Sequence, residues 1–186
     1  MKILLISGSP RKNGNTETLL NHASNFLENK KCEIFKFYVS ENKVNPCQAC
    51  DSCLTNNVCK VNDDMNKLYD FYKKCDGLII GTPVYYRNVS AQLKSIFDRT
   101  YATKNIKPLS KKIGGAISIG RGTGSGQCFA LSIIYNFLLS SGVICIPGEL
   151  NGVSASADKP GEIINQENRL KQVEILCENM LDLFNK

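Results

Sequence analysis

Short runs of isoleucine, leucine and valine alternate along this chain with longer segments in which apolar residues recur every three or four positions. Such short apolar runs predict β-strands, and the longer period predicts amphipathic helices. We expect strands over residues 2–8, 32–39, 77–82, 112–120 and 143–147. All but 32–39 are almost entirely apolar, which is typical of parallel strands that are buried on both faces, whereas the charges of 32–39 suit an edge strand.

Helices are expected in the intervals between these strands. Thr16 is predicted to cap the first helix and Asp63 the second, the third is expected to start near Ser90, and the fourth is expected to stop at Gly142. A last helix closes the chain. This alternation predicts a single α/β domain over residues 1–186, with a flavodoxin-like, doubly wound, five-stranded parallel sheet and helices on both of its faces.

Three loops follow the carboxyl ends of strands, where sheets of this kind bind ligands. The first, 7–15, leads into a helix N-terminus, and its hydroxyl, amide and guanidinium side chains favour a phosphate. No Gly-Lys-Ser/Thr follows the glycines, so a monophosphate is favoured over a nucleoside triphosphate. A polar turn with a helix cap is the alternative interpretation.

The other two loops, 83–88 and 121–126, carry residues that suit a flat aromatic ligand. Pro83, Val84, Tyr85 and Tyr86 can form an apolar and aromatic wall for a flat ligand, although two adjacent tyrosines also occur in ordinary loops. Glycines at alternate positions of the third loop allow a backbone to approach a ring closely. A phosphate loop, an aromatic wall and a glycine-rich loop at one sheet edge together indicate flavin mononucleotide (FMN).

Nine cysteines, one histidine and no tryptophan narrow the chemistry further. The odd cysteine count and the absence of a signal-peptide pattern at the start of the chain predict a cytoplasmic protein. His22 alone excludes sites that need several imidazoles, and its helical apolar setting argues against catalysis. The net charge of +6 comes from scattered lysines, and no apolar run approaches about 20 residues, so we expect neither nucleic acid nor membrane as a partner.

Four of the cysteines lie in one polar loop insertion at residues 40–62, with the spacing C-x2-C-x2-C-x5-C. Ferredoxins open their ligand sequence with the same C-x2-C-x2-C spacing, so a [4Fe-4S] cluster is the favoured interpretation. Zinc, a redox dithiol, or exposed thiols without metal are the alternatives. The candidate metal ligands are Cys47, Cys50, Cys53 and Cys59. The other cysteines are predicted to be buried packing residues, namely Cys32, Cys75, Cys128, Cys145 and Cys177.

The motifs taken together resemble the iron–sulfur flavoprotein family, within the NADPH-dependent FMN reductase group of flavodoxin-like proteins. The resemblance covers essentially the whole chain. It rests on the phosphate loop at 8–16, the cysteine run followed by Asp63-Asp64-Met65, the Pro83-Val84-Tyr85-Tyr86 loop and the sequence Leu93-Lys94-Ser95-Ile96-Phe97-Asp98-Arg99.

The resemblance implies a flavin-dependent oxidoreductase that passes electrons between a [4Fe-4S] cluster and FMN. It further implies ferredoxin or NAD(P)H as the donor, a small-molecule acceptor, and a homodimer or tetramer. The residues expected at the FMN phosphate are Ser9, Arg11, Asn13, Asn15 and Thr16. Those expected around the flavin ring are Pro83, Val84, Tyr85, Tyr86 and Asn88, with Gly122, Thr123 and Gly124 approaching from the third loop.

Two other functions stay open from the residues alone. One is a cluster-free NAD(P)H-dependent FMN or quinone reductase, in which the cysteine loop covers the active site. The other is a zinc-stabilised FMN-binding or redox-sensing module.

Overall fold

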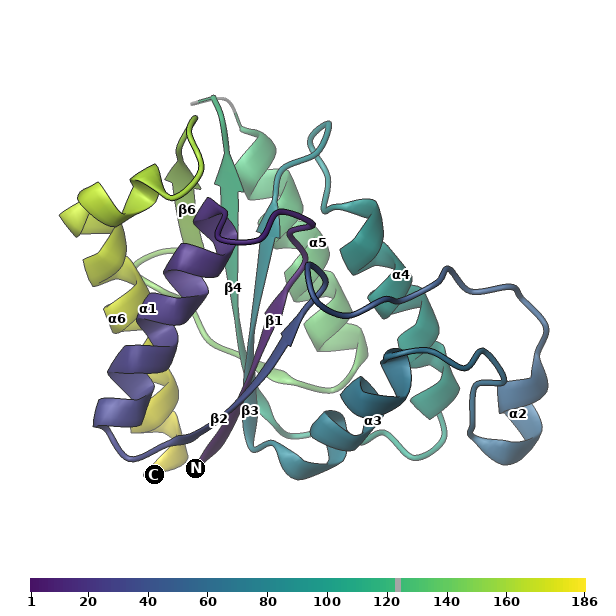
Figure 1. Ribbon diagram of the computed structural model, residues 1–186. Coiled ribbons are helices and arrows are strands. Elements are labelled where there is room, and N and C mark those ends of the chain that lie inside the picture. The colour runs from purple at the N-terminus through teal and green to yellow at the C-terminus, as the bar shows by residue number, and fades with distance from the viewer. Residues whose placement is uncertain (123–124) are drawn as a thin grey trace.

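A parallel β-sheet forms the centre of the computed structural model, which describes residues 1–122 and 125–186 (Figure 1). The strand order is β2-β1-β3-β4-β5, and β6 also pairs with β4. Since β1 lies between β2 and β3, the strand order reverses there, which confirms the predicted doubly wound arrangement. The strands are β1 (Lys2–Ser7), β2 (Glu33–Tyr38), β3 (Gly77–Pro83), β4 (Ile113–Gly120), β5 (Ile144–Cys145) and β6 (Val153–Ser156).

The edge beside β4 differs from the prediction. The expected strand 143–147 is wrong in extent, because β5 pairs only with the start of β4, and a second strand, β6, pairs with the end of β4. Pro147 follows this short strand and has no N–H group to donate to β4. Gly152 leads into β6 with φ +89°, and a Cβ at this position would lie 2.7 Å from the carbonyl oxygen of Ala116. The chain therefore leaves the sheet at Pro147 and returns to it through a glycine.

Helices cover both faces of the sheet (Figure 1). α1 packs against α6 on one face, and α3, α4 and α5 lie on the other. α2 lies apart from the sheet, within the segment that joins β2 to α3. The helices are α1 (Asn15–Asn29), α2 (Ser52–Asn56), α3 (Met65–Lys74), α4 (Ala91–Thr100), α5 (Gly126–Ser140) and α6 (Glu167–Phe184), with short 3-10 helices η1 (Tyr101–Thr103) and η2 (Glu162–Asn165).

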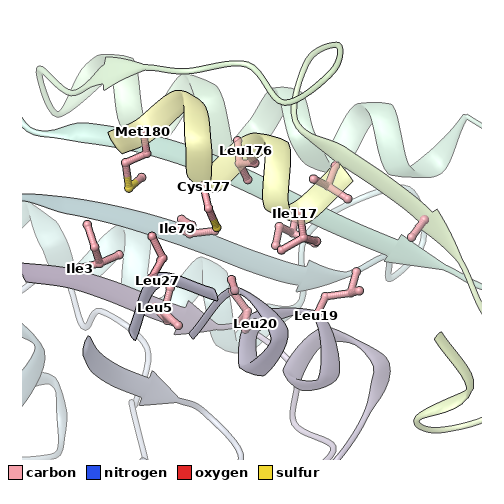
Figure 2. Close-up of a cluster of buried hydrophobic side chains, with 14 of the residues drawn as sticks. Ile3, Leu5, Leu19, Leu20, Leu27, Ile79, Ile117, Leu176, Cys177 and Met180 are labelled. Carbon is pink, nitrogen blue, oxygen red and sulfur yellow. The ribbon is translucent and has the colours of Figure 1, made fainter. Parts of the chain in front are cut away.

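Alternate residues of the strands build two separate hydrophobic cores, because successive strand side chains point to opposite faces. Ile3 and Leu5 of β1 pack with Ile79 beneath α1 and α6, as Figure 2 shows. Leu4 and Ile6 of β1 belong to the core on the other face. Strands buried on both faces explain why the apolar runs in the sequence are nearly continuous.

Helix ends follow the predictions in part. Thr16 is not the cap of α1: Gly14 is, and Thr16 lies inside the helix. Asp64, not the predicted Asp63, is the N-cap residue of α3, although Oδ1 of Asp63 accepts a hydrogen bond of 3.1 Å from the amide of Met65 at the start of the helix. α5 ends at Ser140, and Gly142 follows with φ +77°, as expected of a helix-terminating glycine.

The cysteines expected in the core divide into two groups. Cys32, Cys75 and Cys177 are buried, as predicted. The prediction was wrong for Cys128, which is exposed, and for Cys145, which is half-buried. Cys128 lies on the outer face of α5, whereas Cys145 is in the short edge strand β5. No helix in the described part of the chain is long and apolar enough to cross a membrane.

Candidate functional site

A cavity of about 400 Å³ lies at the carboxyl ends of the strands. Its volume is in the range of small-molecule binding pockets, and its place beside the reversal of strand order is where doubly wound sheets bind ligands. The lining residues come from the loops after β1, β3, β4 and β6: Ser9, Arg11, Gly14, Asn15, Thr16, Pro83, Val84, Tyr85, Tyr86, Ile119, Gly120, Arg121, Ala157, Asp158 and Pro160.

The loop between β1 and α1 is a tight turn. The amide of Arg11 donates to Ser9 Oγ at 3.2 Å, and the amide of Gly14 donates to the carbonyl of Arg11 at 3.4 Å. Asn13 has a left-handed backbone, φ 56°, and its amide donates to Glu17 Oε2 at 2.7 Å. Glu17 is itself buried and accepts a second hydrogen bond from the hydroxyl of Ser40. The Glu17 carboxylate therefore holds this loop to the chain that follows β2.

The start of α1 supplies donors toward the cavity. The first amides of the helix, on Asn15, Thr16 and Glu17, have no partner within the helix. The side chain of Asn15 fixes the loop from the other side, since its Nδ2 donates to the carbonyl of Lys159 at 2.9 Å and its Oδ1 accepts from the amide of Ile163 at 3.2 Å. Free amides at a helix N-terminus, beside the hydroxyl groups and the Arg11 guanidinium, form a donor set for a phosphate.

The aromatic wall is a two-residue hairpin. Tyr85 and Asn88 exchange backbone hydrogen bonds of 2.9 and 3.0 Å, and the two residues between them, Tyr86 and Arg87, have φ values of 50° and 62°. This is the pattern of a type I′ turn, which normally takes asparagine or glycine at both central positions. Left-handed tyrosine and arginine are strained, and strain of this kind is concentrated at binding sites. The turn presents Tyr86, which is fully exposed, to the cavity.

A third wall of the cavity, which the sequence patterns did not predict, comes from the chain at the ends of β4 and β6. Ile119, Gly120 and Arg121 line the cavity beside residues 157–160. The exposed side chains of Arg121 and Asp158 form an ion pair of 3.3 Å that joins the two segments. The short alternation of β6 followed by a Pro-Gly turn could have indicated a strand and a loop there.

Most of the predicted FMN residues meet at this cavity, but several lie outside its lining. The side chain of Asn13 is exposed, and Oδ1 of Asn88 accepts from the amide of Val89 at 2.8 Å. The carbonyl of Gly122 accepts from Gln127 Nε2 at 2.7 Å, which holds the third loop to α5. Thr123 and Gly124 lie outside the described residues.

The residues present at the cavity fit FMN. Its lining includes the start of α1 with Ser9 and Arg11, which suit a phosphate, and also Val84 and the two tyrosine rings, which suit a flat aromatic system. The described side chains of the phosphate loop that line the cavity include no acidic residue.

The four cysteines of the motif lie in the segment that contains α2, away from the sheet (Figure 1). Cys47 and Cys50 are exposed, Cys53 and Cys59 are half-buried, and all four are free thiols. Among the residues that the structure describes, no three cysteine, histidine or acidic side chains are arranged around one metal position. Partial burial raises the pKa of Cys53, and charges on Cys59, Cys50 and Cys47 raise it further, so the four thiols share one neighbourhood.

The chemistry of this segment fits a thiolate-bound metal cluster. Asp51 is left-handed, with φ 54° and ψ 6°, and Ser52 after it is helical. Adjacent left- and right-handed residues form a concave nest of amides, a feature of many iron–sulfur sites. Hydrogen bonds from the backbone and the hydroxyl of Ser52 lower the pKa of Cys50, which favours the thiolate that a metal requires. The four cysteine sulfurs are the soft donors that an iron–sulfur cluster requires.

A parallel doubly wound sheet with a phosphate cradle and an aromatic wall at its carboxyl edge defines the class of flavodoxin-like flavoproteins. The chain also matches the family model "NADPH-dependent FMN reductase" over residues 1–155. An iron–sulfur flavoprotein of Methanocaldococcus jannaschii is 33% identical over 171 residues, which cover 90% of this chain and 89% of that protein. A second iron–sulfur flavoprotein of the same organism is 41% identical over 160 residues, 84% of this chain and 80% of the relative.

Among solved structures, a WrbA-like flavodoxin protein of Agrobacterium tumefaciens has a similar fold, with a TM-score of 0.69, 11% identity, and coverage of 98% of this chain and 95% of that one. The chain therefore belongs to the NADPH-dependent FMN reductase family and, within it, to the iron–sulfur flavoproteins. It is a flavin-dependent oxidoreductase.

Proposed function

We propose that this protein transfers electrons between a [4Fe-4S] cluster bound by Cys47, Cys50, Cys53 and Cys59 and FMN bound in the cavity at the carboxyl ends of the strands. The observation that carries the flavin site is the cavity itself, whose lining combines the N-terminus of α1 with the aromatic side chains of Tyr85 and Tyr86. When bound, FMN supplies one- and two-electron chemistry and the cluster supplies one-electron chemistry.

The residues of the cavity would bind and orient the flavin. Ser9, Arg11, Asn15 and Thr16 would hold the phosphate together with the amides of α1, and Asn13 would keep the loop in its left-handed turn. Pro83, Val84, Tyr85 and Tyr86 would lie along the ring, and the hairpin bonds of Asn88 would keep the tyrosines there. From the third loop, we assign Gly122, Thr123 and Gly124 to the approach toward the flavin.

The electron donor would be a ferredoxin or NAD(P)H, and the acceptor would be a small molecule. Exposure of Cys47 and Cys50 supports a one-electron protein carrier, because such a carrier must come close to the cluster. We also propose a cytoplasmic homodimer or tetramer. The proposals for the donor, the acceptor, the location and the oligomeric state are independent of one another.

Anaerobic purification tests the two cofactors separately. We expect FMN at one per chain, iron and labile sulfide at four per chain as the cluster type requires, and a broad absorbance beneath the flavin bands. The variant Cys53→Ser should lose most of the iron and keep its FMN. The matched control is Cys128→Ser, which replaces an exposed cysteine outside the segment and should keep both.

Other outcomes would select another function. FMN without iron, together with rapid bleaching of the flavin by NADPH alone, would contradict the cluster and select a cluster-free reductase. Stoichiometric zinc with negligible turnover would select a structural or sensing module. Absence of FMN from the purified protein, with no binding of added FMN, would refute the flavin site.

A further inference from the structure

A buried ion pair lies at the base of residues 46–60, the segment that carries the four cysteines and is called the cysteine segment below. Arg99, in α4, and Asp63, just before α3, are 2.7 Å apart between Nη1 and Oδ2, and their side chains are 0% and 5% exposed. A fully buried arginine is rare and needs partners for its donors. This pair takes no part in the flavin cavity.

Two further hydrogen bonds of Arg99, both from its terminal nitrogens, reach the two ends of the cysteine segment, whereas its buried Nε has no hydrogen-bond partner among the described residues. Nη1 donates to the carbonyl of Asn45 at 3.1 Å, and Nη2 donates to the carbonyl of Val61 at 3.1 Å. Asn45 precedes Cys47 by two residues, and Val61 follows Cys59 by two residues. A single guanidinium therefore holds the chain where it enters the segment and where it leaves.

Asp63 also holds the start of the cysteine segment in place. Its Oδ2 accepts from the amide and from the side-chain Nδ2 of Asn45, at 2.9 and 3.1 Å, in addition to Arg99. The hydroxyl of Tyr69, in α3, donates to the carbonyl of Arg99 at 2.7 Å. The ends of the segment are thus joined to each other and to two helices of the folded domain by bonds that contain no metal atom.

Closing a flexible loop costs conformational entropy before any ligand can bridge it. Residues 46–60 carry all four proposed ligands, and the contacts of Arg99 close the two ends of these residues in the folded chain. Binding of a metal group would then have to order only the interior of the segment. The planar fork of arginine suits this task, because lysine has one donor nitrogen and cannot reach both carbonyls and the carboxylate with the same geometry.

We propose that Arg99 and Asp63 are positioning residues for the cysteine site: they hold the two ends of residues 46–60 together in the metal-free protein, so that the thiolates can converge on one metal group. The part of this inference that concerns metal rests on the proposed function. The part that concerns the closed ends does not.

The test uses the reduced, FMN-loaded, metal-free protein and the variant Arg99→Lys. We measure amide hydrogen exchange in peptides covering 46–60, and the affinity for Co²⁺ alone from its thiolate charge-transfer band. Loss of charge-assisted hydrogen bonds should speed exchange in this segment about tenfold and weaken Co²⁺ binding about tenfold. The FMN affinity should stay within about twofold. The matched control is Arg169→Lys, on α6: among the described residues, the Arg169 side chain donates one hydrogen bond, to Gln172 of the same helix at 2.9 Å.

Two results would overturn the inference, and a third concerns the proposed function alone. Unchanged exchange in 46–60 would overturn it, and so would an equal loss of FMN affinity, which would indicate general damage to the fold. Failure of the wild-type protein to bind Co²⁺ or iron would refute the cluster in the proposed function, whereas hydrogen exchange would still decide the role of the pair. If Arg99→Lys does not fold, Asn45→Ala removes the Nδ2 bond to Asp63 and should give smaller changes of the same kind.

Discussion

The strained hairpin at the cavity offers a variant whose stability and flavin affinity should change in opposite directions. Tyr86 has φ 50° in a turn that favours asparagine. A left-handed backbone costs an ordinary residue about 1–2 kcal/mol, and asparagine relieves part of this cost because its short polar side chain tolerates the conformation. We expect Tyr86→Asn to raise the free energy of unfolding of the FMN-free protein by about 0.5–1 kcal/mol, and its Tm by about 1–4 °C.

The same variant removes a ring that lines the cavity and is fully exposed without ligand. Stacking of a nucleic-acid base on an aromatic side chain contributes about 1–3 kcal/mol, and a flavin ring presents a similar flat surface. Loss of the Tyr86 ring should therefore raise the Kd for FMN by about 5-fold to 150-fold, since 1.4 kcal/mol corresponds to a factor of ten. The strain of the free hairpin would then be the cost of holding the ring where FMN binds.

Thermal unfolding followed by circular dichroism gives the Tm, and quenching of flavin fluorescence gives the Kd. Tyr86→Phe keeps both the ring and the backbone and should match the wild type in both measurements. Arg87→Gly places glycine at the neighbouring left-handed position, φ 62°, and should keep the FMN affinity because the Tyr86 ring remains. If Tyr86→Asn left the Tm and the Kd unchanged, both the strain and the stacking would be refuted.

Three further predictions concern the scaffold of the site. Glu17→Ala should lower the free energy of unfolding by about 2 kcal/mol and weaken FMN binding, because the Asn13 amide loses its acceptor. Urea unfolding measures this change, and Glu17→Gln should lower the free energy of unfolding by less. Gly81→Ala should lower the free energy of unfolding by about 1–3 kcal/mol in the same assay, since the added Cβ atom would lie 2.9 Å from Cγ2 of Thr16. Burial raises the pKa of Asp63, but hydrogen bonds from the buried guanidinium and nearby amides bring it below its usual value. The stabilisation by the Asp63 carboxylate is therefore complete above about pH 4 and is lost as the pH falls further. Between about pH 4 and pH 2, the free energy of unfolding should fall more steeply in the wild type than in Asp63→Asn.

Features of the fold that depend on residues close together in the chain could be predicted from the sequence. The apolar runs of β1, β3 and β4 identify strands buried on both faces, and their alternation with helices predicts the doubly wound sheet. The turn chemistry of residues 8–16 predicts a phosphate-binding loop, because a strand, a glycine-rich turn and a helix N-terminus follow one another within a few residues. The cysteine spacing likewise identified a thiol-rich segment.

Features that depend on partners far along the chain were decided only by the tertiary structure. β6 is short and half polar, and it is a strand because it pairs with the end of β4. The cavity wall at 157–160 follows from that pairing. Arg99 looked like one charged residue on an amphipathic helix, but it is buried because the carbonyls of Asn45 and Val61 and the carboxylate of Asp63 surround it. A buried charge is stable only with such partners, and residues 36 to 54 positions away meet it only when the chain folds.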